Sequence, residues 1–182
     1  MQTPVSMQRK TFLRTSLAVG IASTFGGTAA GRSASSRLRS LPRIVRSDEG
    51  RPVTVLGDRM RIKLTGEDTN GLFSLIEEDN EAGVQIPTHV HEREDEVFYV
   101  LAGELELTVG DATTVLQAGD LAFGPRGVAH SWRTVGPSTG VLLSVFPAGL
   151  EAMFAELGEL PPGPPDMARV TETCGRYGIR FV

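Results

Sequence analysis

Two histidines and a group of acids lie close together in the stretch Gly83 to Gly103, which reads GVQIPTHVHEREDEVFYVLAG. On an extended strand His89 and His91 point to the same side, so both imidazoles can reach one metal ion. A carboxylate from the next strand could complete one face of the coordination sphere, and Glu96 is the candidate. Taken alone, such a pair is as compatible with surface or core histidines as with metal ligands.

The other acids of this stretch are not expected to bind the metal ion. Glu92, Glu94 and Asp95 are predicted to form a solvated turn between two strands, and Asp95, beside Glu96, could also support the metal ligands from behind.

The third and last histidine, His130, lies in GDLAFGPRGVAHSWRT, where Pro125 and Gly127 predict a turn and His130 begins the following strand. Two aromatic residues lie two positions further along the strands that carry the candidate ligands, Phe98 after Glu96 and Trp132 after His130. They should share the inward face and offer a flat ligand a packing surface, or else be ordinary barrel core.

Alternation of polar and apolar residues predicts the strands that must position these side chains. In 59–64 every second residue is apolar, and a hairpin is expected at Gly110-Asp111. Glycines and prolines between short runs favour an all-β fold, a closed antiparallel barrel or double-sheet jelly roll with short C-terminal helices outside it. The expected strands are 59–64, 72–76, 97–101, 105–109, 113–116, 121–123 and 141–146, and the expected helices are 150–157 and 167–177.

Composition and charge narrow the function. The 182 residues suit one domain plus a terminal extension, and the single Cys174 is expected to be a buried, inert thiol. Segment 47–182 holds ten Lys and Arg against twenty-two Asp and Glu, a net charge of −12, which disfavours nucleic acid as a partner. A phosphate-binding glycine loop is missing from the sequence, which disfavours nucleotide enzymes.

The N-terminal 30 residues have the order of an export signal, with a basic region, an apolar run from Ser16 to Phe25 and then small residues. Segment 9–14, RKTFLR, resembles a twin-arginine signal in which Lys10 replaces the second arginine. We therefore expect a protein exported to the periplasm or beyond, with no membrane segment after cleavage; an ordinary secretory signal or an uncleaved anchor are the alternatives. Residues 31–50 are expected to be a flexible basic linker and 51–182 the folded domain.

The two histidine-containing stretches resemble the two motifs of the cupin superfamily. Gly83, His89, His91, Glu96 and Gly103 match the first motif at every spacing, and Gly119, Pro125, Gly127 and His130 match the second, with Thr134 in place of its asparagine. The resemblance covers about 53–146. It implies a small β-barrel that holds one divalent metal ion through His89, His91, Glu96 and His130.

Further stretches resemble single-domain cupins related to quercetin dioxygenases: 64–71, LTGEDTNG, 147–150, PAGL, and 176–181, RYGIRF. This resemblance implies a non-heme metal dioxygenase, with dioxygen and a small flavonol- or catechol-like substrate as partners and Glu96 as a catalytic base. Another cupin metalloenzyme (an isomerase, decarboxylase or hydrolase of a small acid or sugar) and a non-catalytic binder remain alternatives. The metal could be Fe, Mn, Ni, Cu, Co or Zn, and a homodimer is plausible through exposed strand edges.

Overall fold

A computed structural model describes residues 40–161 and 164–182 of the chain. The expected export signal, 1–30, lies outside the described residues, as do residues 31–39 of the expected linker. Within the described part, no helix combines the length and the apolar character needed to cross a membrane.

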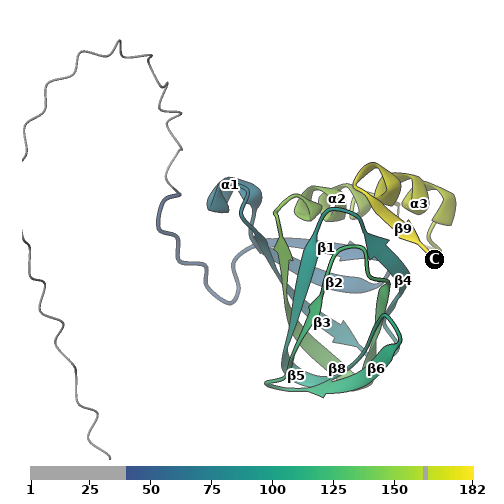
Figure 1. Ribbon diagram of the computed structural model, residues 1–182. Coiled ribbons are helices and arrows are strands. Elements are labelled where there is room, and N and C mark those ends of the chain that lie inside the picture. Colours follow the sequence, from purple (N-terminus) through teal and green to yellow (C-terminus); the bar gives the residue numbers. More distant parts are fainter. Residues whose placement is uncertain (1–39, 162–163) are drawn as a thin grey trace, which may run out of the picture. The chain divides into compact units, whose positions relative to one another are not determined.

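The described residues form an antiparallel sheet that curls into a barrel, so the predicted all-β fold is confirmed (Figure 1). The strands pair in the order β1-β2-β3-β8-β4-β9, and β5 joins β8 to β6 and β7. Their bounds are β1 Arg51–Val55, β2 Asp58–Leu64, β3 Ser74–Glu81, β4 Gln85–His91, β5 Asp95–Val109, β6 Ala112–Gln117, β7 Leu121–Gly124, β8 His130–Phe146 and β9 Ile179–Phe181.

Most expected strands are present, and the hairpin predicted at Gly110-Asp111 joins β5 to β6. The expected strands 97–101 and 105–109 are two halves of the single strand β5, which continues through a bulge at Gly103. Gly103 has φ +72°, and a Cβ at this position would lie 2.1 Å from the carbonyl oxygen of Ser138. This glycine therefore allows the backbones of β5 and β8 to approach each other closely, and it does not end a strand.

Three short elements were not expected from the sequence. They are strand β1, the four-residue helix α1 (Gly66–Thr69) and strand β9, which pairs with β4 beside the histidines. Strand β1 forms a hairpin with β2 through Leu56 and Gly57, both with positive φ. A leucine in this conformation is uncommon.

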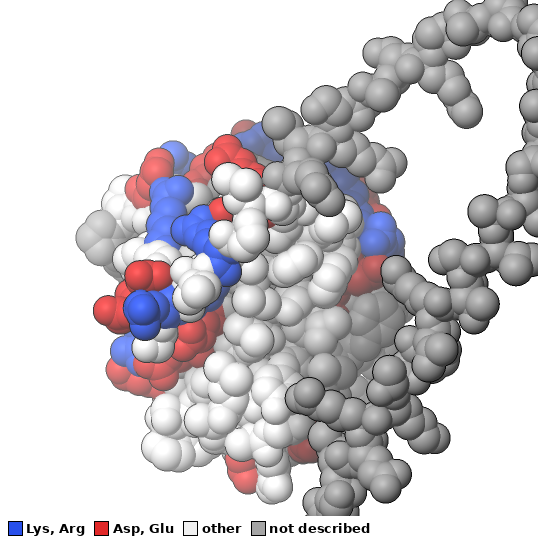
Figure 2. Space-filling view, turned by 90° about the vertical axis from the view of Figure 1, so that its left-hand side faces the viewer, with Lys and Arg blue, Asp and Glu red and all other residues white. Residues whose placement is uncertain are grey.

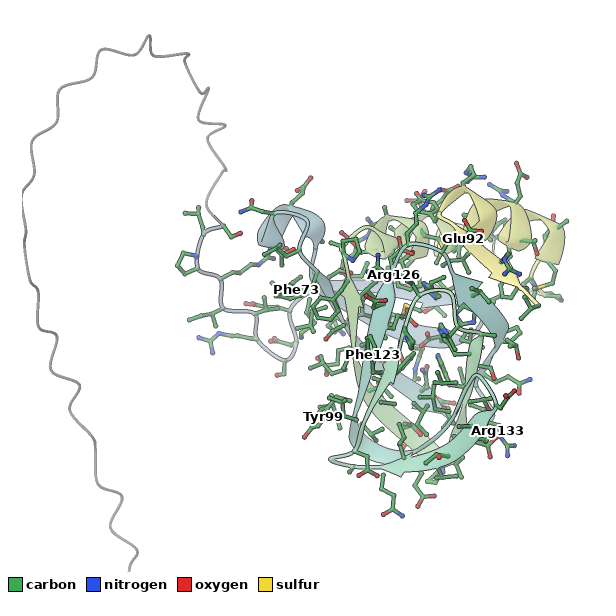
Figure 3. All side chains as sticks on the ribbon, in the orientation of Figure 1. Phe73, Glu92, Tyr99, Phe123, Arg126 and Arg133 are labelled. Carbon is green, nitrogen blue, oxygen red and sulfur yellow. The ribbon has the colours of Figure 1, made fainter. Side chains whose placement is uncertain are left out.

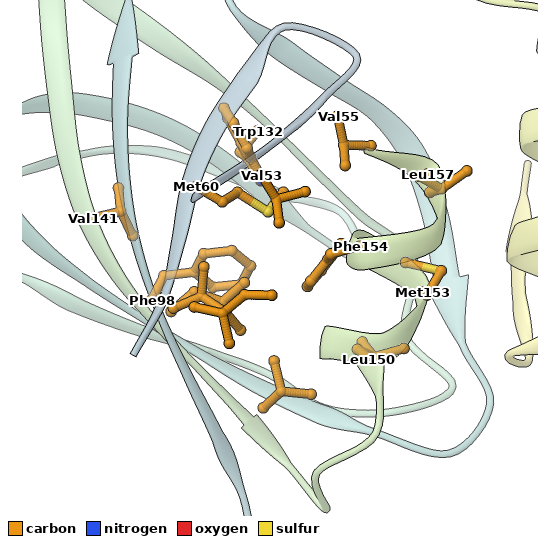
Figure 4. Packing of buried hydrophobic residues seen from close by; sticks show 14 of the residues in the cluster. Val53, Val55, Met60, Phe98, Trp132, Val141, Leu150, Met153, Phe154 and Leu157 are labelled. Atoms are coloured by element: carbon orange, nitrogen blue, oxygen red, sulfur yellow. The ribbon is translucent and has the colours of Figure 1, made fainter. Parts of the chain in front are cut away.

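Two helices, α2 (Leu150–Leu157) and α3 (Met167–Arg176), lie over one end of the barrel, in good agreement with the predicted ranges (Figure 1). The apolar face of α2 is buried as its spacing predicts, and Figure 4 shows Phe154 extending from α2 toward Met60 and Phe98. Asp166 caps α3 by accepting hydrogen bonds from the amides of Ala168 and Arg169. The helices thus close the barrel mouth, and the expected buried thiol Cys174 lies on their inner side.

A lysine fixes the segment that leads into the barrel. Lys63 is 8% exposed, and its ammonium group donates to the carbonyl oxygens of Arg46, Ser47 and Glu49 at 2.8, 3.0 and 2.8 Å. The same group lies 3.2 Å from the carboxylate of Glu77. The charge of Lys63 is therefore satisfied mainly by backbone that precedes the first strand.

The outward face of β5 and β7 exposes several large apolar side chains. Tyr99 lies opposite Leu121, and Val97 opposite Phe123, so the apolar residues are contiguous across the two strands. Figure 3 shows Tyr99 pointing away from the barrel, and Figure 2, which looks onto this side, shows a broad uncharged area. We call this surface the β5–β7 face; it comprises Tyr99, Leu101, Leu121 and Phe123.

Candidate metal centre

Four side chains from three strands meet inside the barrel. His89 and His91 come from β4, Glu96 from the start of β5 and His130 from the start of β8. His89 lies directly opposite His130 in the β4–β8 ladder. One potential ligand atom from each of the four residues lies within 4.8 Å of the other three, and all four side chains are buried. The structure therefore brings together every residue proposed as a metal ligand from the sequence.

Backbone carbonyl groups orient two of the three imidazoles. Nδ1 of His89 lies 2.8 Å from the carbonyl oxygen of Pro87, and Nδ1 of His130 lies 3.1 Å from that of Val128. A carbonyl oxygen only accepts hydrogen bonds, so each Nδ1 carries the proton. Nε2 of His89 is then left with a lone pair directed into the cluster, as a metal ligand requires, whereas Nε2 of His130 carries a proton that it donates to Glu96 in the absence of metal.

The third imidazole, His91, has no hydrogen-bond partner for either ring nitrogen among the described residues. Its Nε2 lies 3.7 Å from Glu96 and its Nδ1 lies 3.8 Å from Glu94, both beyond hydrogen-bonding distance. Buried imidazoles are normally satisfied, so this orphaned ring indicates that a group is to be bound between His91 and its neighbours.

Glu94 was expected in a solvated turn, and this prediction is wrong. Its side chain is buried, with one carboxylate oxygen unpaired among the described residues, and it faces Nδ1 of His91. The neighbouring Glu92 is exposed, as expected. If Nε2 of His91 binds a metal, Glu94 is placed to accept the proton on Nδ1, an arrangement that raises the basicity of a ligating histidine.

Glu96 and His130 are closely coupled, since Nε2 of His130 lies 3.0 Å from Oε2 of Glu96. Burial alone would raise the pKa of Glu96, but the facing His91 and His130 hold this pKa at about 2, so the carboxylate is ionised. Burial opposes a charge on His130, yet the hydrogen bond and the charge of Glu96 raise its pKa above the ordinary value. Burial lowers the pKa of His89 to about 4, which keeps that ring neutral.

Two contacts join the turn before His130 to the strand ends that carry the other ligands. The amide of Gly127 donates to the carbonyl oxygen of His91 at 2.7 Å, and Gly127 has φ +78°. Arg126 donates through its amide and its guanidinium to Asp95, and also to the carbonyl oxygen of Phe146. Asp95 thus holds the turn in place and does not contact the cluster.

The donor set suits a divalent transition metal ion. Three imidazole nitrogens and one carboxylate oxygen are ligands common to iron, manganese, nickel, copper, cobalt and zinc. Nδ1 of His89 and Nδ1 of His130 each face a backbone carbonyl group, so that Nε2 is the nitrogen each ring presents to the cluster, and the third imidazole has no hydrogen-bond partner among the described residues. The cluster can therefore hold one metal ion, whose identity these ligands do not select.

The cluster lies at the side of an apolar cavity inside the barrel, below α2 and α3. Phe98 and Trp132 both line this cavity, as expected from their positions after Glu96 and His130. The cavity has a volume of about 60 Å³. That is less than half of the roughly 150 Å³ cavity that accommodates one benzene ring.

Two further acids line the same cavity and were not identified from the sequence: Asp58 at the start of β2 and Glu78 in the middle of β3. Both are almost completely buried. The run of acids and amide from Glu77 to Glu81 resembles a solvated edge, and only the pairing of β3 with β2 and β8 shows which residues face inward.

Comparisons with known proteins support the fold. Residues 76–146 match the cupin domain family. Among curated proteins, the chain is 28% identical to quercetin 2,3-dioxygenase from Bacillus subtilis over 118 residues, 65% of this chain and 35% of that protein. It is 34% identical to germin-like protein subfamily 2 member 2 from Arabidopsis thaliana over 137 residues, 70% of this chain and 60% of that protein. The chain thus spans between about a third and three fifths of these relatives.

Solved structures with the same fold include KdgF from Halomonas sp., with a TM-score of 0.56 and 19% identity, covering 62% of this chain and 99% of that one. A predicted oxalate decarboxylase from Thermotoga maritima has a TM-score of 0.52 and 26% identity, covering 57% of this chain and 98% of that one.

Proposed function

Because this chain belongs to the cupin superfamily, we propose that it is a metal-dependent dioxygenase that acts on a small aromatic, catechol-like substrate. The observation that carries this proposal is the buried cluster of three histidines and Glu96 at the side of a cavity with apolar and aromatic walls. The similarity to a quercetin dioxygenase supports the same reaction class.

His89, His91, Glu96 and His130 would hold the metal ion. A divalent ion supplies Lewis acidity, which makes a nearby substrate hydroxyl a stronger acid, and in a redox-active form it supplies dioxygen chemistry. Glu96 is the catalytic residue of the proposal, because its ionised carboxylate faces the cluster and can accept the hydroxyl proton. Phe98 and Trp132 pack against the ring and exclude water.

The small cavity favours a single ring over a flavonol. Even one ring requires part of the wall to move, since the cavity is smaller than a benzene site. The wall below the barrel mouth consists of Met153, Phe154 and Leu157 from α2, with Leu56 from the β1–β2 hairpin. These two elements close only one end of the barrel, so a shift of either can admit a substrate without opening the sheet.

Oxygen consumption distinguishes this proposal from its rivals. Protein loaded separately with Fe²⁺, Mn²⁺, Ni²⁺, Cu²⁺ or Co²⁺ is mixed with catechols in an oxygen electrode, and ring-opened products are analysed by mass spectrometry. We expect oxygen uptake that Glu96→Gln abolishes and Glu77→Gln, an outward change on β3, preserves. Turnover of a small acid or sugar without oxygen would support another cupin metalloenzyme, and ligand binding without turnover would support a binder; either result contradicts the dioxygenase.

The proposed site of action is outside the cytoplasm, reached by the twin-arginine route. This proposal is supported by the pattern of Arg9 to Arg14 and the apolar run after it, in a part of the chain outside the described residues. A folded, metal-loaded domain avoids competition among metal ions after export, which is a physical reason to join this signal to this barrel.

A further inference from the structure

A second polar group lies inside the barrel, apart from the metal ligands. On the inner face of β2 and β3, Asp58, Met60, Glu78 and Asn80 form a patch in which Met60 pairs directly with Glu78. Glu78 is opposite Val141 on β8, whereas Glu96 is opposite Val145. At about 3.3 Å per residue, the backbones of the two glutamates are offset by roughly 13 Å along β8.

Asp58 is fixed by its neighbours. The amide nitrogen of Asn80 donates to Oδ1 of Asp58 at 2.6 Å, and the amide oxygen of Asn80 accepts from the backbone N–H of Arg59 at 2.8 Å. The second contact fixes the orientation of the Asn80 amide, so its nitrogen must face Asp58. Asp58 is therefore held as a hydrogen-bond acceptor at one side of the cavity.

Glu78 has no such support. Its side chain is 2% exposed, it lines the cavity, and it makes no hydrogen bond to any residue of the described part of the chain. Buried carboxyl groups almost always have a hydrogen-bond partner, because an unsatisfied one is costly. A carboxyl group directed into a cavity without a partner indicates a place where a ligand supplies one.

The charges around Glu78 define what that ligand can carry. No lysine or arginine is among the described residues that line the cavity. Burial, together with the negative charges of Asp58 and Glu96, raises the pKa of Glu78 well above its ordinary value, and burial raises the pKa of Asp58 to about 7. Each carboxyl group of this acidic pair keeps an acceptor oxygen whether it is protonated or ionised, so a hydrogen-bond donor satisfies it, and an ammonium group would in addition favour the ionised form.

We propose that Glu78, positioned beside Asp58 and Asn80, is a specificity-determining residue that binds a hydroxyl or ammonium group on the part of the substrate remote from the metal cluster. The substrate would then be a ring with a phenolic hydroxyl at the cluster and a donor group at the other end. The aromatic nature of this ligand rests on the proposed function; the preference for a donor rests on Glu78 alone.

Three phenols test the proposal with zinc-loaded protein, which binds without oxidising them. They are 4-methylphenol, 4-(hydroxymethyl)phenol and 4-(aminomethyl)phenol, and binding is measured by calorimetry. A hydrogen bond to a buried carboxyl group predicts that at least one donor-bearing phenol binds about tenfold or more tightly than 4-methylphenol. Glu78→Leu should abolish this advantage, and Glu77→Gln, a change to the adjacent outward glutamate, should leave it intact.

Glu78→Gln separates the two donors, because glutamine keeps an acceptor oxygen but cannot ionise to pair with an ammonium group. It should retain a preference for the hydroxymethyl compound and lose any preference for the aminomethyl one. Circular dichroism of each variant checks that the barrel is folded.

The outcomes are distinct. Equal binding of all three phenols to the wild type, or an advantage that survives Glu78→Leu, would overturn the role of Glu78 and leave the aromatic cavity standing. Binding of none of them would overturn both. A donor preference that depends on Glu78 supports the proposal even if no oxygen is consumed.

Discussion

His91→Leu should have opposite effects on stability in the absence and presence of metal. In the metal-free protein both ring nitrogens of His91 are buried and unpaired among the described residues. An unsatisfied buried polar group costs about 1–3 kcal/mol, and leucine has a similar volume without polar atoms. The variant should therefore be more stable than the wild type by about 1–3 kcal/mol when metal is absent.

Bound metal should make the wild type more stable than the His91→Leu variant. An ion present at a hundredfold excess over its dissociation constant stabilises the folded protein by about 2.7 kcal/mol. For a domain of this size each kcal/mol raises the melting temperature by about 3 °C, so the wild type should gain about 8 °C. Without His91 the ion loses one of its four ligands, and the variant should gain little at the same metal concentration.

The assay is thermal unfolding followed by circular dichroism, with chelator and then with Zn²⁺ or Mn²⁺. Thr134→Val is the matched control, because the Thr134 hydroxyl is also buried and unpaired in the described structure but is not part of the cluster. It should stabilise the metal-free protein and keep the metal-induced shift. A His91→Leu protein that melts lower than the wild type in chelator, or that keeps the full metal shift, would refute the assignment of His91 as a metal ligand.

Four further predictions follow from other parts of the chain. Gly103→Ala should destabilise the domain by more than the roughly 1–2 kcal/mol that an alanine costs in the left-handed conformation, because its Cβ would also meet the Ser138 carbonyl group. The measurement is urea unfolding, and the control is Gly83→Ala, where φ is also positive but no atom lies near the added Cβ. Arg126 holds the pKa of Asp95 at about 2, below its ordinary value, so their pairing stabilises the folded state above about pH 4 and this contribution is lost as the pH falls to about 2. Asp95→Asn should remove this pH dependence of stability in acid unfolding curves, and a curve identical to that of the wild type would contradict the prediction. If the expected homodimer forms through the β5–β7 face, Phe123→Asp should yield a folded monomer in light scattering while Val115→Asp, on β6, should not; a dimer in both variants excludes this face. Arg9→Lys should abolish export in cell fractionation, and normal amounts of processed protein outside the inner membrane would indicate a general secretory signal instead.

Local spacing allowed the strands and the pairing of His89 with His91 to be predicted, whereas His130 was joined to them only by the resemblance to the two cupin motifs. His89 and His91 share a side of any extended strand, and the turn at Pro125 and Gly127 sets the start of the strand that carries His130. The sequence could not show that the turn is joined to His91 by the Gly127 amide, since that contact links residues far apart in the chain.

The burial of Glu78 and Glu94 could not be predicted from the sequence. In β3 two glutamates are adjacent, and periodicity alone gives no reason for Glu78 to be the one that faces inward. Glu94 lies in an acidic stretch that composition assigns to solvent, yet the bend before β5 turns it toward His91. In each case the burial of a charged residue depends on partners from other strands, so composition predicts the opposite.

The contacts of Lys63 define where the independently folding unit begins. A fragment that starts at Arg46 retains all three carbonyl groups that receive the ammonium, because Arg46, Ser47 and Glu49 all precede the first strand. A fragment that starts at Arg51 keeps every strand but leaves this buried cation with only the carboxylate of Glu77. Limited proteolysis should accordingly leave a resistant core whose N-terminus lies at or before Arg46, several residues ahead of the boundary that strand assignment alone would suggest.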